Sequence, residues 1–144
     1  MTIKEKLSHL EAINIEKLFD DILRENESII CDMNRKQLYD DGSVDVNNPG
    51  KKEKYSPLTA LAKRTAPYNK TDFITLKWKG DFHDSLKITI FKDKFIIHSK
   101  NLVWANYLEP QSRFGSALGL TKKSKSGLRD LAKKEMIKKI HNAL

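Results

Sequence analysis

Two carboxylates and an imidazole lie within four positions of the chain, at Asp81, His83 and Asp84 in the stretch LKWKGDFHDSLK. Such groups could bind a metal ion or form an acid–base pair. They could equally form the polar side of a turn that leads into a β-hairpin. The other three histidines fall on other segments without the spacing of metal ligands. We therefore favour a turn, in which Asp81 and Asp84 cap a short helix, over a small metal-dependent hydrolase.

Other residues that could do chemistry lack the partners that such chemistry needs. Gly50-Lys51-Lys52 matches a phosphate-binding loop only at its end, because the first glycine and the final hydroxyl residue are missing. Cys31 is the one cysteine of the chain and lies in the apolar stretch SIICDM, where a thiol behaves as a small hydrophobic group. The sequence therefore predicts no catalytic residue, no metal site and no cofactor.

The composition indicates one charged domain. The chain has 144 residues, of which 39% are hydrophobic and 32% are charged. This length suits a single core, and we expect residues 1–144 to form one domain. The sequence shows neither a long apolar run nor the pattern of a signal peptide. We therefore expect a protein that folds in a reducing cytoplasm and does not bind a membrane.

Charge is distributed unevenly along the chain. Residues 1–50 carry six Lys and Arg against eleven Asp and Glu, a net charge of −5. Residues 51–144 carry twenty-one against eight, a net charge of +13. A basic surface favours nucleic acid as a partner. A chain with one acidic and one basic part can also pair head-to-tail with copies of itself.

The first part of the chain has the pattern of amphipathic helices. Thr2 and Glu5 have the spacing of a capping box, in which each side chain bonds the other residue's backbone N–H. Apolar residues then recur at helical spacing, which predicts a helix over residues 3–26 with a break near residue 12, where Asn14 can start a new helix. The patch at 28–33 could be a strand or the end of a helix.

A loop and a short helix follow. Residues 40–57, DDGSVDVNNPGKKEKYSP, are rich in Asp, Asn, Gly and Pro and show no period. We predict a long loop here that is mobile in the free subunit and becomes ordered on binding a neighbour. Pro57 after Ser56 suits the first turn of a short helix that reaches about Thr65.

The last part of the chain predicts a hairpin and a long helix. Residues 86–91 and 95–100 alternate in the manner of two antiparallel strands joined by KDK. From Thr121 onward the period is helical, with a buried stripe formed by Leu128, Leu131, Ala132, Met136 and Ile140. The fold class is therefore α+β, with helices packed on a small antiparallel sheet, a central β-hairpin and a long C-terminal helix.

The predicted C-terminal helix is strongly basic. Asp130 and Glu135 are its acidic residues, against eight cations at Lys122, Lys123, Lys125, Arg129, Lys133, Lys134, Lys138 and Lys139. Such a row can simply be a solvated helix face. It can also contact a partner or DNA phosphate without reading sequence. Lysine outnumbers arginine here, which fits loose electrostatic contact better than base recognition.

Several segments together resemble a known family. The first is Leu–x–x–x–Gly–x–Phe–x–x–Ser–Leu, at Leu76, Gly80, Phe82, Ser85 and Leu86, followed by the hairpin. Residues 103–107 (VWANY), the stretch 114–121 and a final amphipathic helix come next, while NRKQLY (34–39) and YSP (55–57) lie upstream. In this order they resemble tailed-phage morphogenesis proteins, the tail-completion or head–tail joining proteins of the neck. The chain departs at residue 79, where the family commonly has Thr and this chain has Lys.

The resemblance implies a structural protein of the virion, without enzymatic activity, that assembles in the host cytoplasm. Its expected partners are copies of itself in a homo-oligomeric ring, together with neighbouring portal or connector and tail proteins. Non-specific contact with packaged DNA is a further expectation. The alternative is a basic accessory protein that binds nucleic acid.

Overall fold

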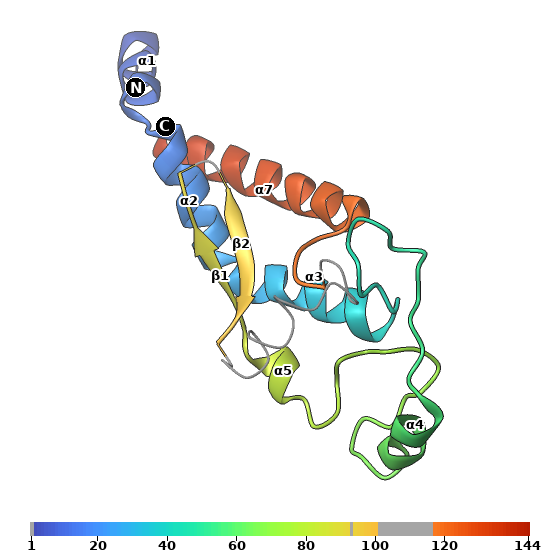
Figure 1. The fold of residues 1–144 in the computed structure, drawn as a ribbon. Helices are drawn as coiled ribbons and strands as arrows, with labels where there is room; N and C mark the ends of the chain where they lie inside the picture. Colours follow the sequence, from blue (N-terminus) through green and yellow to red (C-terminus); the bar gives the residue numbers. More distant parts are fainter. Residues whose placement is uncertain (1, 93, 101–116) are drawn as a thin grey trace.

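The computed structural model describes residues 2–92, 94–100 and 117–144, and within them the predicted α+β class is confirmed (Figure 1). Helices pack with a two-stranded antiparallel sheet, and a long helix closes the chain. The elements in order are α1 (Ile3–Ala12), α2 (Ile15–Glu25), α3 (Glu27–Tyr39), α4 (Pro57–Lys63), α5 (Asp81–Asp84), β1 (Leu86–Ile90), β2 (Phe95–Ser99) and α7 (Lys122–Ala143).

The predicted first helix is two helices, separated where the sequence placed the break. The capping box is confirmed, because Glu5 N–H donates to Thr2 Oγ1 at 3.1 Å and Thr2 N–H donates to Glu5 Oε2 at 2.7 Å. Ile13 and Asn14 are extended, and Asn14 Oδ1 accepts from Lys17 N–H at 3.1 Å. Asn14 therefore starts α2 as an N-cap, as predicted.

Helix α3 decides the interpretation that the sequence left open. The patch at 28–33 is helical and belongs to the first half of α3, so it is neither a strand nor the end of a helix. Its buried apolar side chains, Ile30, Cys31 and Leu38, follow helical spacing and belong to the core. Burial also raises the pKa of the Cys31 thiol, so this cysteine remains protonated.

The predicted hairpin is confirmed and packs on α3. The strands pair from Leu86 opposite Ser99 to Ile90 opposite Phe95. A two-stranded hairpin is only marginally stable in water, so it needs this support. Glu27, at the start of α3, accepts a hydrogen bond from Ile88 N–H at 3.2 Å and pairs with Lys87 Nζ at 3.5 Å. The outer edge of β1 is thus held by α3.

Helix α7 starts and packs largely as predicted. Thr121 is its N-cap and accepts from Ser124 N–H at 3.3 Å. Leu128 and Ala132 of the predicted stripe are buried, while the other three residues of the stripe are half-buried. The helix packs against α2, and Leu128 joins the core that α3 and the hairpin share. No helix among the described residues is long and apolar enough to cross a membrane.

Residues 40–56 form no helix or strand, as predicted, and α4 begins at Pro57 with Ser56 as its N-cap. The start of this loop is anchored, since Gly42, Ser43 and Val44 are buried. Gly42 has φ of +66°, and a Cβ there would lie 2.6 Å from the ring of Phe73. The predicted mobility of the loop stays a prediction. Because residues 42–44 are buried, we now expect mobility only in the part of the loop after Val44.

Candidate functional site

The family-like segment at 76–86 forms a buried turn that leads into the hairpin. Leu76, Phe82 and Leu86 are core residues. Leu76 has φ of 58° and Gly80 has φ of 98°, so two left-handed positions bend the chain before β1. Ser85 Oγ donates to Phe82 O at 2.6 Å and lies 2.6 Å from Ser99 Oγ. These residues shape the fold and present little surface to a ligand.

The three side chains that opened the sequence analysis do not converge. Asp81 and Asp84 are exposed, whereas His83 is buried. The predicted caps are wrong, because Gly80 occupies the N-cap of α5 and no side chain caps that helix. Its left-handed backbone is one that glycine adopts without strain, which explains why a glycine takes the cap. Among the described residues, no group of three or more His, Cys, Asp or Glu could hold a metal ion.

His83 is held as a neutral imidazole. Its Nε2 lies 2.8 Å from the carbonyl oxygen of Thr75, which can only accept, so Nε2 carries the proton. Its buried Nδ1 has no hydrogen-bond partner among the described residues. Burial lowers the pKa of His83 to about 4, and the hydrogen bond to Thr75 opposes this only in part. The ring is therefore uncharged at neutral pH.

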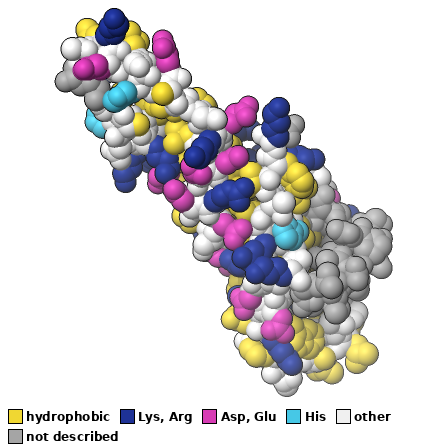
Figure 2. Space-filling model, turned by 90° about the vertical axis from the view of Figure 1, so that its left-hand side faces the viewer, with side chains coloured by type: hydrophobic (Ala, Val, Ile, Leu, Met, Phe, Trp, Pro, Cys, Tyr) yellow, Lys and Arg dark blue, Asp and Glu magenta, His cyan; other side chains and the backbone are white. Residues whose placement is uncertain are grey.

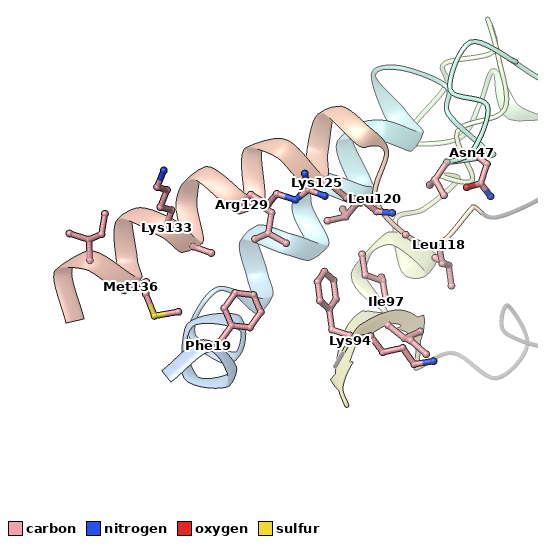
Figure 3. A pocket seen from close by; sticks show the side chains of 17 residues that line it. Phe19, Asn47, Lys94, Ile97, Leu118, Leu120, Lys125, Arg129, Lys133 and Met136 are labelled. Atoms are coloured by element: carbon pink, nitrogen blue, oxygen red, sulfur yellow. The ribbon is translucent and has the colours of Figure 1, made fainter. Parts of the chain in front are cut away.

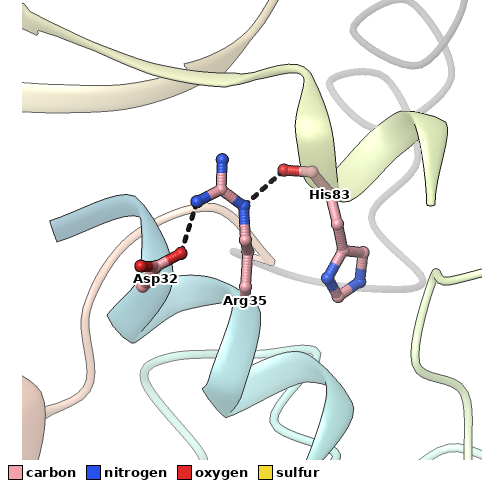
Figure 4. Close-up of polar contacts among 3 residues, drawn as sticks. All are labelled: Asp32, Arg35 and His83. Atoms are coloured by element: carbon pink, nitrogen blue, oxygen red, sulfur yellow. Dashed lines mark hydrogen bonds and ion pairs between the residues drawn. The ribbon is translucent and has the colours of Figure 1, made fainter. Parts of the chain in front are cut away.

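A side chain of helix α3 holds the turn at α5 by bonding to the backbone of that turn. Arg35 Nε donates to the carbonyl oxygen of His83 at 2.6 Å, and Arg35 Nη1 pairs with Asp32 Oδ1 at 2.6 Å (Figure 4). The carboxylate of Asp32 lies one turn earlier on the same helix and orients the guanidinium. Arg35 thereby joins α3 to α5 across 48 positions of sequence.

Two buried amide side chains of α3 fix the approach to α7. Asn34 donates to Ala117 O at 3.0 Å and accepts from Gly119 N–H at 2.9 Å. Gln37 donates to Gly119 O at 3.0 Å and accepts from Thr121 N–H at 3.1 Å. We call these four hydrogen bonds the amide clamp. It joins NRKQLY to the described part of the stretch 114–121, two segments that the resemblance had named separately.

The amide clamp was missed by the sequence analysis, although the chain carries a signal for it. Asn34 and Gln37 are three positions apart and share a helix face with Ile30 and Leu38. Amide side chains on an otherwise apolar face need partners when buried. Residues 103–107, Phe114 and Ser116, which the resemblance also uses, lie outside the described residues.

The basic residues of α7 are at the surface. Seven of the eight cations are exposed, and the eighth, Lys139, pairs with Glu25 of α2 at 3.0 Å. The hydrogen bond with Glu25 raises the pKa of Lys139. Lys125, Arg129 and Lys133 border a pocket, and the other cations of α7 are not among the residues that line it. The structure therefore divides the predicted basic row into two groups.

That pocket is a groove of about 820 Å³ between α2, β2 and α7 (Figure 3). We call it the α2–β2–α7 groove. Its cations are Lys94, Lys125, Arg129 and Lys133, and no carboxylate is among the described residues that line it. Its apolar side chains come from all three elements, from the loop residue Val46 and from the segment before α7: Phe19, Val46, Phe95, Ile96, Ile97, Leu118, Leu120, Leu128, Ala132, Met136 and Ile137. It can receive an apolar segment of a partner.

Helix α1 is the second unusual surface. It is the N-terminal helix and extends beyond the end of α2, and none of its residues is buried (Figure 1). The exposed fractions of Ile3, Leu7 and Leu10 are 79%, 53% and 42%. Hydrophobic side chains are visible at this narrow end in the space-filling view (Figure 2). An apolar stripe of this kind lies against a partner in most proteins.

Lysines and aromatic rings also gather beyond the end of α3. Lys70 Nζ lies 4.4 Å from the ring centre of Phe73 and 5.1 Å from that of Tyr39, and Lys77 Nζ lies 4.0 Å from that of Tyr68. Lys70 also donates to Tyr39 O at 3.0 Å. The contacts of Lys70 with Tyr39 join segment 64–78 to α3, and the other two cation–π contacts lie within that segment. Sequence periodicity cannot reveal contacts of this kind.

Among the described residues, the apolar groove and the apolar stripe of α1 are two surfaces that can bind a partner. Comparison of the chain with protein-family models, with curated proteins and with solved structures found no match.

Proposed function

We propose that this protein is a structural subunit of a homo-oligomeric ring in the neck of a tailed-phage virion. In this role it completes the tail or joins it to the head, and it contacts copies of itself and neighbouring portal, connector or tail proteins. The neck location rests on the sequence resemblance. The role as an assembly subunit rests on the structure of α1.

The exposed stripe of α1 is the observation that carries the proposal. Burying each of its three large aliphatic side chains is worth about 1.5–3 kcal/mol. The chain leaves them in water although its own α2 and α7 bury residues of the same type. A partner that covers α1 therefore gains several kcal/mol of binding free energy. An assembly subunit needs a surface of this kind, and a free monomer does not.

The charge distribution supports assembly through two different surfaces. The first 50 residues are net negative, and they include α1, α2 and α3. The remainder is net positive, and α7 displays seven exposed cations. Two unlike surfaces make a head-to-tail contact, which closes into a ring when the rotation between neighbours divides a full turn.

The test is the native mass of the purified protein, followed by imaging of labelled protein on virions. We expect one discrete oligomer and a label at the junction of head and tail. A single monomer mass at every concentration, with no label on virions, would overturn the proposal. A discrete oligomer with label elsewhere in the particle would retain the assembly role and remove the neck location.

A basic accessory protein that binds nucleic acid is the second candidate, and the exposure of the α7 cations favours it. The distinguishing measurement is binding of the free monomer to unrelated duplex DNA over a range of salt. Counterion release would give a steep linear fall of log K with log salt. A ring subunit that uses α7 for protein contact would bind such DNA weakly in its monomeric state.

A further inference from the structure

Helix α1 is directed away from the rest of its own chain by a short fixed hinge. Ile13 N–H donates to Leu10 O at 3.2 Å, and Asn14 Oδ1 accepts from Lys17 N–H at 3.1 Å. Both hinge residues are extended, with ψ of 122° and 103°. The cap holds Asn14 extended, so α1 does not continue as one helix with α2 and lies beyond its end (Figure 1). A short constrained hinge favours the exchange of the helix before it between copies of a chain.

The α2–β2–α7 groove has the chemistry that such a helix needs. Apolar side chains on three sides of its rim are partly exposed: Phe19 at 42%, Ile96 at 43% and Ile137 at 60%. An amphipathic helix binds a groove of this kind through residues at i, i+4 and i+7. Ile3, Leu7 and Leu10 have that spacing.

Charge favours a second copy of this chain as the source of the helix. Four cations and no carboxylate are among the described residues that line the groove. Helix α1 itself is neutral, with two Lys and two Glu, and α2, which follows it, carries four Asp and Glu against two Lys and Arg and is net negative. The apolar stripe of α1 therefore matches the apolar lining of the groove, and the net-negative α2 beside it matches the cations of the groove; all of these belong to the same chain.

We propose that α1 of one copy binds in the α2–β2–α7 groove of the next copy. This inference rests on the proposed assembly function and names its contact. Since the helix and the groove are different surfaces, the contact is head-to-tail and each copy both gives and receives one helix. The contact is buried on assembly, and Leu7, at the middle of the stripe, faces the groove.

Disulfide trapping between separate chains tests this contact. One full-length chain carries Leu7→Cys and the other Ile137→Cys, and the two are mixed under mild oxidation. Cys31 is 1% exposed and can stay in place. We expect a covalent dimer on a non-reducing gel at least tenfold above the control pair, Leu58→Cys with Ile137→Cys. Leu58 is a matched control because it is an apolar helix residue, on α4, with an exposed fraction of 79%.

Equal dimer yields in the test and control pairs would overturn the inference. A second readout is the native mass of Leu7→Glu/Leu10→Glu, against Ser8→Glu/Ala12→Glu, which adds the same charge to the opposite face of α1. We expect loss of the oligomer only in the first variant. If the wild-type protein assembles but neither readout responds, α1 is not the contact and the assembly function stands. If the wild-type protein is monomeric and no dimer is trapped, both fail.

Discussion

Helices α1 and α7 both leave much of their surface in water, but the two surfaces differ in kind. Helix α7 buries Leu128 and Ala132 and exposes a row of cations. Helix α1 buries nothing and exposes its apolar stripe. An exposed charged face is the ordinary state of a surface helix, so α7 alone does not require a partner. An exposed apolar stripe is unusual on a surface helix, so α1 is the stronger indication of assembly.

The largest expected effect is on the free energy of unfolding, which should respond to the loss of a leucine from α7 but not to the loss of one from α1. Leu128→Ala leaves a cavity in the core and should lower the free energy of unfolding by about 2–5 kcal/mol. Leu7→Ala, at a position with 53% exposure, should change that of the monomer by less than about 0.5 kcal/mol. Urea unfolding of both variants at a concentration where the protein is monomeric measures the difference. A similar loss in both would mean that α1 packs on its own chain.

Acid should destabilise the body of the protein through the buried His83. The pKa of His83 is about 4 in the folded state and 6.5 in an ordinary environment. The unfolded chain therefore takes up a proton first, and stability falls as the pH drops from about 6.5 to 4. The full loss is about 3 kcal/mol, from 1.36 kcal/mol per pKa unit. Melting of wild type and His83→Gln across this range is the measurement, and a flat difference between them would contradict a neutral buried His83.

The amide clamp should have the next largest effect on the free energy of unfolding, because it determines where α7 begins. Asn34→Ala removes the partners of Ala117 O and Gly119 N–H and should cost about 1–3 kcal/mol for each group left buried without a partner. Asn142→Ala, at an exposed position of α7, is the control and should have little effect. Chemical unfolding of the two variants compares them. Equal stability would mean that water replaces the clamp.

The sequence predicted the elements better than their contacts. Local signals sufficed for the capping box at Thr2, the cap at Asn14 and the hairpin, because each depends on residues within a few positions. The amide clamp joins residues more than eighty positions apart, and periodicity shows only that Asn34 and Gln37 share a face. The groove depends on how α2, β2 and α7 meet, which no single pattern encodes. The cap predicted at Asp81 failed because Gly80 already provides the left-handed turn.

The smallest expected effect on stability comes from the charges of α7. Reversing Lys133, Lys134, Lys138 and Lys139 to Glu should leave the melting temperature nearly unchanged, since exposed charges contribute little. The ion pair of Lys139 with Glu25 is lost in this variant, so a triple reversal that keeps Lys139 is the control.

The same reversal should still impair assembly, and Lys133 is the reason. Lys133 borders the groove that we assign to α1, so a carboxylate there would repel the net-negative α2 that follows α1 in the neighbour. The single variant Lys133→Glu should then weaken the oligomer, while Lys134→Glu, exposed on the same helix but away from the groove, should not. Native mass at several salt concentrations separates the two. Normal assembly and normal DNA retention in the quadruple variant would make the basic face of α7 a solvated surface, and the contrast with α1 would then rest on the apolar stripe alone.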